Sequence, residues 1–204
     1  MTGSSRGSGK PSAGSSPRRP KPLPSGPVPK AIGPAPRRAL PPGPEGALPP
    51  TLRVRVVSGP SLDLLGQREP EVYGTATLAQ IHAGLVAFAD QRGVFVECLQ
   101  SNNEGDLVTW IGRAANEGFD GIVLNAAAFT HTSIAILDAI RACDLPTVEV
   151  HLSNPEAREA FRHASIIAPA CVGKVTGFGA ASYMLGLLAL VNHLRDGGEL
   201  RTEA

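Results

Sequence analysis

Short segments rich in β-branched and other apolar residues alternate with helical patterns from Leu52 almost to the end of the chain. We predict strands over residues 52–57, 94–99, 120–124, 146–150 and 166–168. Apolar residues at helical spacing predict helices over residues 77–92, 103–118, 133–143, 155–161 and 180–194. Strands that alternate with helices form parallel sheets with right-handed crossovers, covered on both faces. The pattern therefore predicts a doubly wound α/β protein, a three-layer sandwich around a five-stranded parallel sheet.

Residues 1–50 differ sharply in composition from the rest of the chain. They hold 14 of the 19 prolines and carry a net charge of +7, whereas the remaining 154 residues carry −6. So few large apolar side chains cannot offset the entropy of ordering the chain. We predict a disordered tail rich in Pro, Gly, Ser and Arg over residues 1–50 and a folded domain over residues 51–204.

Several roles for this tail stay open: a solvated extension, a start codon placed too early, a linker, a targeting peptide or a nucleic-acid-binding arm. It lacks the apolar core of a secretory signal, and its proline density forbids the amphipathic helix of a transit peptide. The negative charge of the domain opposes nucleic-acid binding, so we expect no nucleic-acid partner.

Other residue patterns exclude whole classes of protein. No apolar stretch approaches the ~20 residues that a membrane-spanning helix needs. The three cysteines (Cys98, Cys143 and Cys171) lack C-x-x-C spacing and lie in apolar segments, which argues against a disulfide framework or a zinc site. The five histidines show no metal-binding spacing either. We expect no metal, no membrane association and a reducing, cytoplasmic location.

Ligands of doubly wound proteins bind beyond the carboxyl ends of the strands. That rule selects four polar segments, residues 58–61, 103–104, 125–133 and 151–154. The Gly-Phe-Gly sequence of residues 177–179 is weakly similar to a dinucleotide-binding turn, but no strand or ribose-binding acid follows it. We expect these glycines to let a helix pack closely on a strand, and we expect no cofactor.

Three local features are candidates for chemistry. Glu149 and His151 alternate along a predicted strand, so they share a face and the carboxylate can orient the imidazole. Arg158 and Arg162 are four residues apart, a spacing that shares a helix face. The loop over residues 58–74 is long enough to be a lid. A buried structural pair, solvated salt bridges and a packed loop are the corresponding structural explanations.

Taken in chain order, these segments resemble the motifs of type II 3-dehydroquinate dehydratases. The matching segments, between about Leu52 and Leu194, are Gly59-Pro60, Leu64-Leu65-Gly66, Arg68-Glu69-Pro70, Tyr73-Gly74, Gln100-Ser101-Asn102, Thr130-His131-Thr132-Ser133, Glu149-Val150-His151-Leu152-Ser153-Asn154 and Ala157-Arg158-Glu159. The resemblance implies a flavodoxin-like fold, no metal or cofactor, and a homo-oligomer, a dodecamer of four trimers. It implies that the protein is a lyase that dehydrates 3-dehydroquinate to 3-dehydroshikimate by anti elimination through an enolate. The same reaction serves the shikimate pathway of aromatic amino acid biosynthesis and the breakdown of quinate.

The resemblance also assigns roles to particular residues. Tyr73 would be the base, Arg68 would stabilise developing negative charge, and His151, oriented by Glu149, would protonate the departing hydroxyl. Six further residues would bind the substrate: Leu152 and Ser153 through backbone amides, Asn125, His131 and Arg162 at the ring hydroxyls, and Asp138 from a neighbouring subunit.

Three departures from the family pattern bear on activity. Serine replaces asparagine at Ser58 and Ser61, and the family uses the second asparagine to contact the enolate oxygen or its bridging water. Ala126-Ala127 stand where glycine or proline is common, and Leu137 stands where arginine is usual. Because the proton-transfer residues are retained, we expect an active dehydratase that is slowed by the serines at Ser58 and Ser61. The alternative is a catalytically impaired paralogue that binds a shikimate-like ligand or a protein partner.

Overall fold

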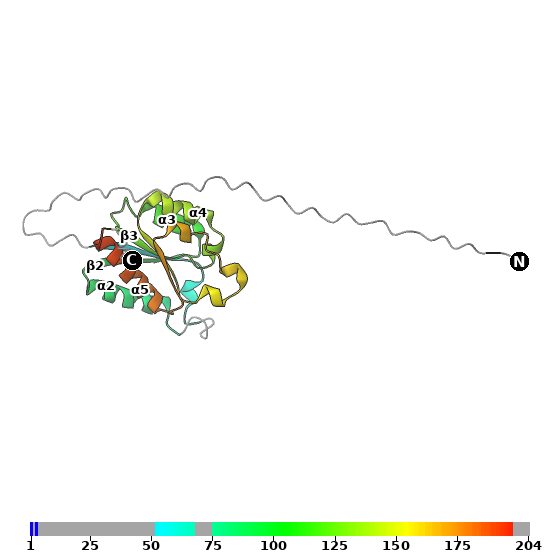
Figure 1. Ribbon diagram of the computed structural model, residues 1–204. Helices are drawn as coiled ribbons and strands as arrows, with labels where there is room; N and C mark the ends of the chain where they lie inside the picture. Colours follow the sequence, from blue (N-terminus) through cyan, green and yellow to red (C-terminus); the bar gives the residue numbers. More distant parts are fainter. Residues whose placement is uncertain (2, 4–51, 68–74, 198–204) are drawn as a thin grey trace, which may run out of the picture. The chain divides into compact units, whose positions relative to one another are not determined.

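The computed structural model describes residues 1, 3, 52–67 and 75–197, and within these residues it has one five-stranded sheet (Figure 1). The strands are β1 (Leu52–Ser58), β2 (Val94–Gln100), β3 (Gly121–Asn125), β4 (Thr147–His151) and β5 (Gly173–Thr176). All neighbours are parallel, in the order β2-β1-β3-β4-β5. The chain first leaves β1 for β2 and later returns to the other side of β1 at β3. The switch in strand order, where such folds bind ligands, therefore lies between β1 and β3.

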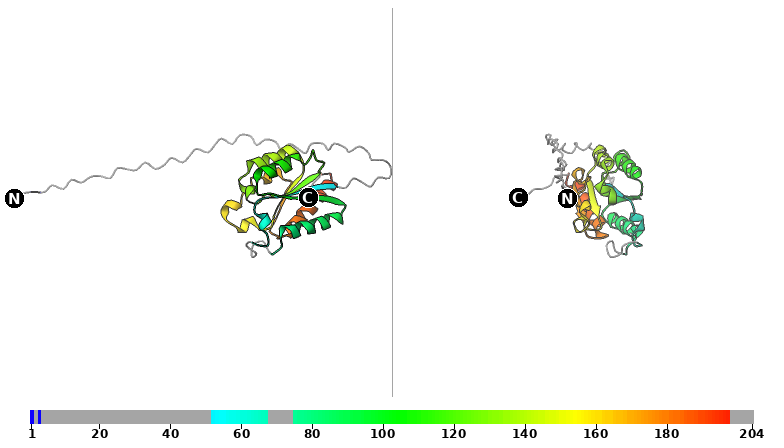
Figure 2. Two further views of the ribbon diagram at one scale, coloured as in Figure 1. Left: turned by 180° about the vertical axis from the view of Figure 1, so that it is seen from behind. Right: turned by 90° about the vertical axis from the view of Figure 1, so that its right-hand side faces the viewer.

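Helices cover both faces of the sheet (Figure 2). On one face lie α2 (Leu78–Asp90) and α5 (Ala181–Arg195), and on the other lie α3 (Glu104–Arg113) and α4 (Ile134–Cys143). Val56 packs with the first pair of helices and its neighbour Val57 with the second, because successive strand residues point to opposite faces. The predicted three-layer, doubly wound architecture is confirmed.

Local sequence explains where two of the helices begin. The Thr77 side chain accepts a hydrogen bond from the backbone N–H of Gln80, whose own side chain bonds back to Thr77, forming a capping box for α2. Ser133 caps α4 through a 2.9 Å bond from the backbone N–H of Ile136. The predicted helix over 103–118 is shorter than expected: it begins at Glu104 and ends at Arg113, and the side chain of Asn103 does not cap it.

The position of the fifth strand was predicted wrongly. Ile167, in the predicted strand 166–168, is fully buried under α3 and α4, and a 3₁₀ turn, Ala168–Ala170, begins immediately after it. Pro169 in that turn has no N–H to donate to a sheet. The actual fifth strand, β5, is a short edge strand of half-exposed and exposed residues, and such a strand has no apolar run to reveal it.

Two further expectations are corrected. Residues 155–161 do not form one helix but two separate 3₁₀ turns, because Arg158 between them has an extended backbone (φ −107°, ψ −167°). Gly177 and Gly179 are favoured because the backbone has a positive φ at both positions, and not because a helix packs closely on a strand there. The glycine that lets a helix approach a strand is Gly186 of α5, where a Cβ would clash with Cγ1 of Val150 in β4.

Candidate active site

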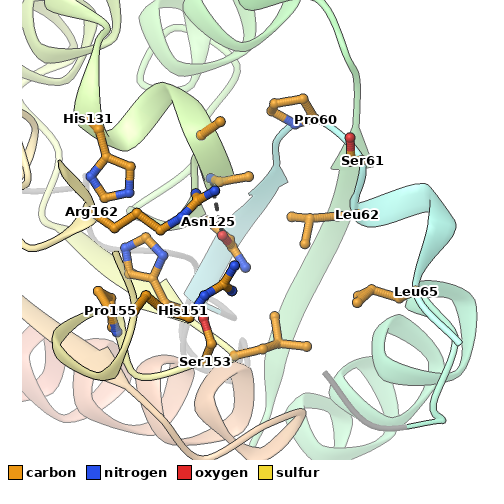
Figure 3. Close-up of a pocket in the computed structure, with 14 residues that line it drawn as sticks. Pro60, Ser61, Leu62, Leu65, Asn125, His131, His151, Ser153, Pro155 and Arg162 are labelled. Atoms are coloured by element: carbon orange, nitrogen blue, oxygen red, sulfur yellow. Dashed lines mark hydrogen bonds between the residues drawn. The ribbon is translucent and has the colours of Figure 1, made fainter. Parts of the chain in front are cut away.

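A cavity of about 280 Å³ opens at the carboxyl edge of the sheet, beside the switch between β1 and β3 (Figure 3). Its walls come from the segments that follow β1, β3 and β4. The predicted site residues that line it are Ser61, Asn125, His131, His151, Leu152, Ser153 and Arg162. Segments far apart in sequence meet here because the carboxyl ends of parallel strands share one edge.

His151 and Glu149 form the acid–base centre of the cavity wall. His151 Nε2 lies 2.7 Å from Glu149 Oε1, and the carboxylate is completely buried beneath the imidazole. A carboxylate accepts, so Nε2 carries the hydrogen and Nδ1 is the nitrogen left to exchange a proton. Ser165 Oγ donates a 2.9 Å bond to the other carboxylate oxygen of Glu149. The sequence-derived expectation that these two side chains share a face is confirmed, whereas Ser165 was not predicted.

His131 has one ring nitrogen committed to the backbone. Its Nδ1 lies 2.7 Å from the carbonyl oxygen of Ala164, so Nδ1 must donate. Nε2 is then free to accept a hydrogen bond from a ligand when the imidazole is neutral. The ring is fixed in orientation, which suits a residue that recognises a hydroxyl group.

Two guanidinium groups make the outer wall of the cavity cationic. Arg162 Nε lies 2.9 Å, and Arg158 Nε 3.4 Å, from the same oxygen of Glu159. A backbone hydrogen bond and the bond from Arg162 lower the pKa of the exposed Glu159 carboxyl. Arg158 and Arg162 therefore place guanidinium groups at the wall of the cavity, where they can bind an anionic ligand.

The loop after β3 holds Asn125 by its own backbone. Asn125 is 2% exposed, and its Oδ1 accepts a 3.2 Å hydrogen bond from the backbone N–H of Ala127. Ala127 has a φ of +50°, a left-handed conformation that a residue with a Cβ adopts at a cost. The loop also packs against the residue that follows β1, since a Cβ at Gly59 would lie 2.6 Å from the carbonyl oxygen of Ala126. Glycine at position 59 is therefore required by this contact.

Ser61 also has a left-handed backbone, with φ +62°. Its backbone N–H donates a 2.8 Å hydrogen bond to Oδ1 of Asn102, which ties the loop after β1 to the loop after β2. Asparagine tolerates this conformation better than serine. The loop geometry thus favours the residue type that Ser61 replaces.

Two other residues named in the sequence analysis do not line the cavity. Asp138 is exposed on α4 and does not line the cavity. Ser58 is fully buried at the end of β1. Arg68 and Tyr73 lie outside the described residues.

Metal and membrane features were searched in the same described residues. No group of three or more His, Cys, Asp or Glu side chains in the described part of the chain is placed to hold a metal ion. Across residues 52–67 and 75–197, no helix is both long and apolar enough to cross a membrane. What the cavity offers is a set of fixed proton donors, acceptors and cations within a doubly wound α/β protein, suited to acid–base chemistry on a small anionic molecule.

Comparison with known proteins identifies the family. The family model described as "Dehydroquinase class II" matches residues 52–191. A 3-dehydroquinate dehydratase from Ruegeria pomeroyi is 56% identical over 145 residues, which cover 71% of this chain and 97% of that protein. One from Thermus thermophilus is 53% identical over 146 residues, covering 72% of this chain and 98% of the relative. The chain belongs to the class II dehydroquinase family.

Solved structures agree with this assignment. The type II dehydroquinase of Butyrivibrio crossotus matches with a TM-score of 0.67 and 37% identity over 69% of this chain and 97% of that one. The type II dehydroquinase of Propionibacterium acnes matches with a TM-score of 0.66 and 38% identity, over 69% of this chain and 96% of the other. The flavodoxin-like fold that the sequence motifs implied is therefore confirmed.

Proposed function

We propose that this protein is a 3-dehydroquinate dehydratase, which removes water from 3-dehydroquinate to give 3-dehydroshikimate. The observation that carries the proposal is the hydrogen-bonded pair of Glu149 and His151 at the wall of the cavity, in a chain of the class II dehydroquinase family. An imidazole held by a buried carboxylate is the device that a general acid needs, since the carboxylate compensates the positive charge of the protonated ring.

The elimination breaks one C–H bond and one C–O bond. We assign the base to Tyr73, which takes a proton from the carbon beside the ketone so that an enolate forms. The enolate then expels the hydroxyl group, which leaves as water with a proton from Nδ1 of His151. Arg68 stabilises the developing negative charge. The assignments of Tyr73 and Arg68 rest on the family motif alone, because both residues lie outside the described ones.

The remaining roles follow the lining of the cavity. The backbone amides of Leu152 and Ser153, directly after β4, bind the substrate carboxylate. Asn125, His131 and Arg162 bind the ring hydroxyls. Support for His131 comes from its orientation by the Ala164 carbonyl, which leaves Nε2 for a substrate hydroxyl.

We also propose that the active site is completed in a homododecamer of four trimers. Asp138 is exposed on α4 and is not among the residues that line this chain's own cavity, so we place it against the cavity of a neighbouring copy. We further propose a cytoplasmic location, which the three free cysteines, Cys98, Cys143 and Cys171, support.

The test is the absorbance of the conjugated enone product when purified full-length protein meets 3-dehydroquinate. Turnover that is lost in Tyr73→Phe and in His151→Ala, with the oligomer intact, is the expected result. No turnover by the wild-type oligomer would defeat the proposal. Heat protection by 3-dehydroshikimate without turnover would instead identify a non-catalytic paralogue that binds the ligand.

A further inference from the structure

Asn102, in the loop after β2, belongs to a family motif to which the proposed mechanism assigns no role. Its side-chain Oδ1 accepts a 2.8 Å hydrogen bond from the backbone N–H of Ser61 and a 3.1 Å bond from Nε2 of Gln100. Its Nδ2 lies 3.4 Å from Oδ2 of Asp63, in the turn after β1. Both ends of the Asn102 amide are therefore used, and two of its three partners lie about 40 positions away in the sequence.

Backbone groups fix the orientation of the two amide side chains. The Ser61 N–H can only donate, so the atom that faces it is the oxygen of Asn102 and not its nitrogen. The Gly59 carbonyl can only accept, and it lies 3.4 Å from Nε2 of Gln100, so this end of Gln100 is the NH₂ group. The two bonds that Asn102 Oδ1 accepts occupy both of its lone pairs. Together the two amides hold the loop on either side of Pro60.

The residue held in this way forms part of the cavity wall. Ser61 lines the cavity and Asn102 does not, and Figure 3 shows Ser61 across the cavity from His131. The backbone N–H of Ser61 is used by Asn102, and the Ser61 side chain does not cap the turn that follows it. The hydroxyl is therefore the donor that Ser61 can offer to a ligand.

The backbone of Ser61 needs such a contact. Its φ of +62° is a conformation that a residue with a Cβ adopts at a cost, so the surrounding structure must hold it. Asn102 binds the N–H of Ser61, and the N–H of Leu64 donates a 3.3 Å bond to its carbonyl oxygen. Because Asn102 is exposed, water can replace its hydrogen bonds, but water cannot fix a backbone angle. Loss of Asn102 should therefore change the geometry of the loop more than the stability of the fold.

We propose that Asn102 is a positioning residue, which holds Ser61 in the conformation that presents its hydroxyl to the enolate or to the water bound to it. Gln100 and Asp63 contribute by orienting the Asn102 amide. The inference rests on the proposed function, because it is that reaction which places an enolate in the cavity.

Two neighbouring asparagines provide the first test. Asn102→Ala removes the bond to Ser61 and is expected to lower kcat roughly tenfold, with KM for 3-dehydroquinate much less affected, because a misplaced donor weakens transition-state stabilisation more than substrate binding. Asn103→Ala is the matched control, since Asn103 does not line the cavity and its Nδ2 bonds Asp106 of α3 at 3.3 Å. This control should leave both kinetic constants unchanged.

A reciprocal exchange tests the bonds themselves. Asn102→Asp keeps an acceptor for Ser61 but sets a second carboxylate beside that of Asp63, where the present atoms are 3.4 Å apart, so kcat should fall. Adding Asp63→Asn pairs a donor with an acceptor again, with the roles exchanged, and kcat is expected to return close to the wild-type value.

A double-mutant cycle tests whether Asn102 acts through Ser61. Ser61→Gly removes the hydroxyl, so Asn102→Ala should change kcat much less in that background than in the wild type. An equal loss of kcat in the two backgrounds would overturn the inference, because Asn102 would then act on another part of the site.

A readout independent of turnover separates this inference from the proposed function. Hydrogen exchange of the substrate-free protein, followed by mass spectrometry, should be faster in the peptide that contains Ser61 in Asn102→Ala than in the wild type and in Asn103→Ala. If the wild type has no dehydratase activity, the proposed function fails, and this exchange alone decides whether Asn102 holds the loop. An active enzyme whose kcat and exchange are both unchanged in Asn102→Ala would overturn the inference.

Discussion

Ser165 and His151 bind the two oxygens of one buried carboxylate, that of Glu149, at 2.9 Å and 2.7 Å. The serine comes from the segment before β5 and the histidine from the end of β4. The carboxylate is thereby held on both sides, and it fixes the tautomer of the histidine that faces the cavity.

Substitution of Glu149 is expected to slow the reaction more than substitution of Ser165. Glu149→Gln leaves His151 without its charged acceptor and lowers kcat by roughly 10² to 10⁴. Ser165→Ala keeps the carboxylate but frees one oxygen, and lowers kcat by roughly tenfold. Steady-state turnover of 3-dehydroquinate measures both. Thr109→Ala, which removes an exposed hydroxyl bonded to the Gly105 carbonyl, is the control. A Ser165→Ala enzyme that is less stable but equally fast would show that Ser165 acts only on folding.

Ser61→Asn is expected to raise turnover. The left-handed backbone at this position suits asparagine, and an amide supplies the second donor that serine lacks. A gain of up to about 10² in kcat corresponds to one recovered donor. Asp144→Gly, which relieves a φ of +54° at the end of α4, separates backbone strain from chemistry. Asp144→Gly should raise the melting temperature without raising kcat. An unchanged or lower kcat in Ser61→Asn would show that the serine at this position does not limit the reaction.

Two glycines in helices are expected to respond in opposite ways to alanine. At Gly186 the new Cβ would clash with Val150 of β4, so Gly186→Ala should destabilise the fold by about 1 to 3 kcal/mol. At Gly84 of α2 nothing lies within 4 Å, so Gly84→Ala should stabilise it by roughly 0.5 to 1 kcal/mol. Denaturant unfolding of the two variants measures the difference. Equal effects of the two substitutions would mean that α5 and β4 are not in this close contact.

Tyr183 is expected to limit stability in alkali. Burial raises its pKa from 10.0 to about 12, so above pH 10 the unfolded chain loses this proton before the folded chain does. Ionisation of this group therefore leaves the free energy of unfolding unchanged below pH 10. As the pH rises from 10 towards 12, the free energy of unfolding falls by about 3 kcal/mol in total. Tyr183→Phe, which cannot ionise, should show a shallower fall between pH 10 and 12. Half-buried Cys98 and Cys171, whose pKa values are also raised to about 12 by desolvation, contribute equally to both proteins. Parallel curves for the two proteins would exclude Tyr183 as the cause.

Patterns of period two and period 3.6 were enough to predict the first four strands, the main helices and the three layers, because each such element buries one continuous face. The alternation of Glu149 and His151 was likewise enough to predict that their side chains meet. Motif order along the chain pointed to the class II dehydroquinase family, which the family model confirms.

Features that depend on an exposed edge strand, or on hydrogen bonds between residues far apart in sequence, could not be predicted from these patterns. β5 is half exposed and carries no apolar signal, so only its pairing with β4 reveals it. The bond between Ser58 and Tyr183 joins residues 125 positions apart, and that between Ser165 and Glu149 joins residues 16 apart. Sequence fixes which side chains a strand or helix turns inward, because that follows from local geometry. Which inward-facing polar groups become partners is decided only when the sheet and helices close around them.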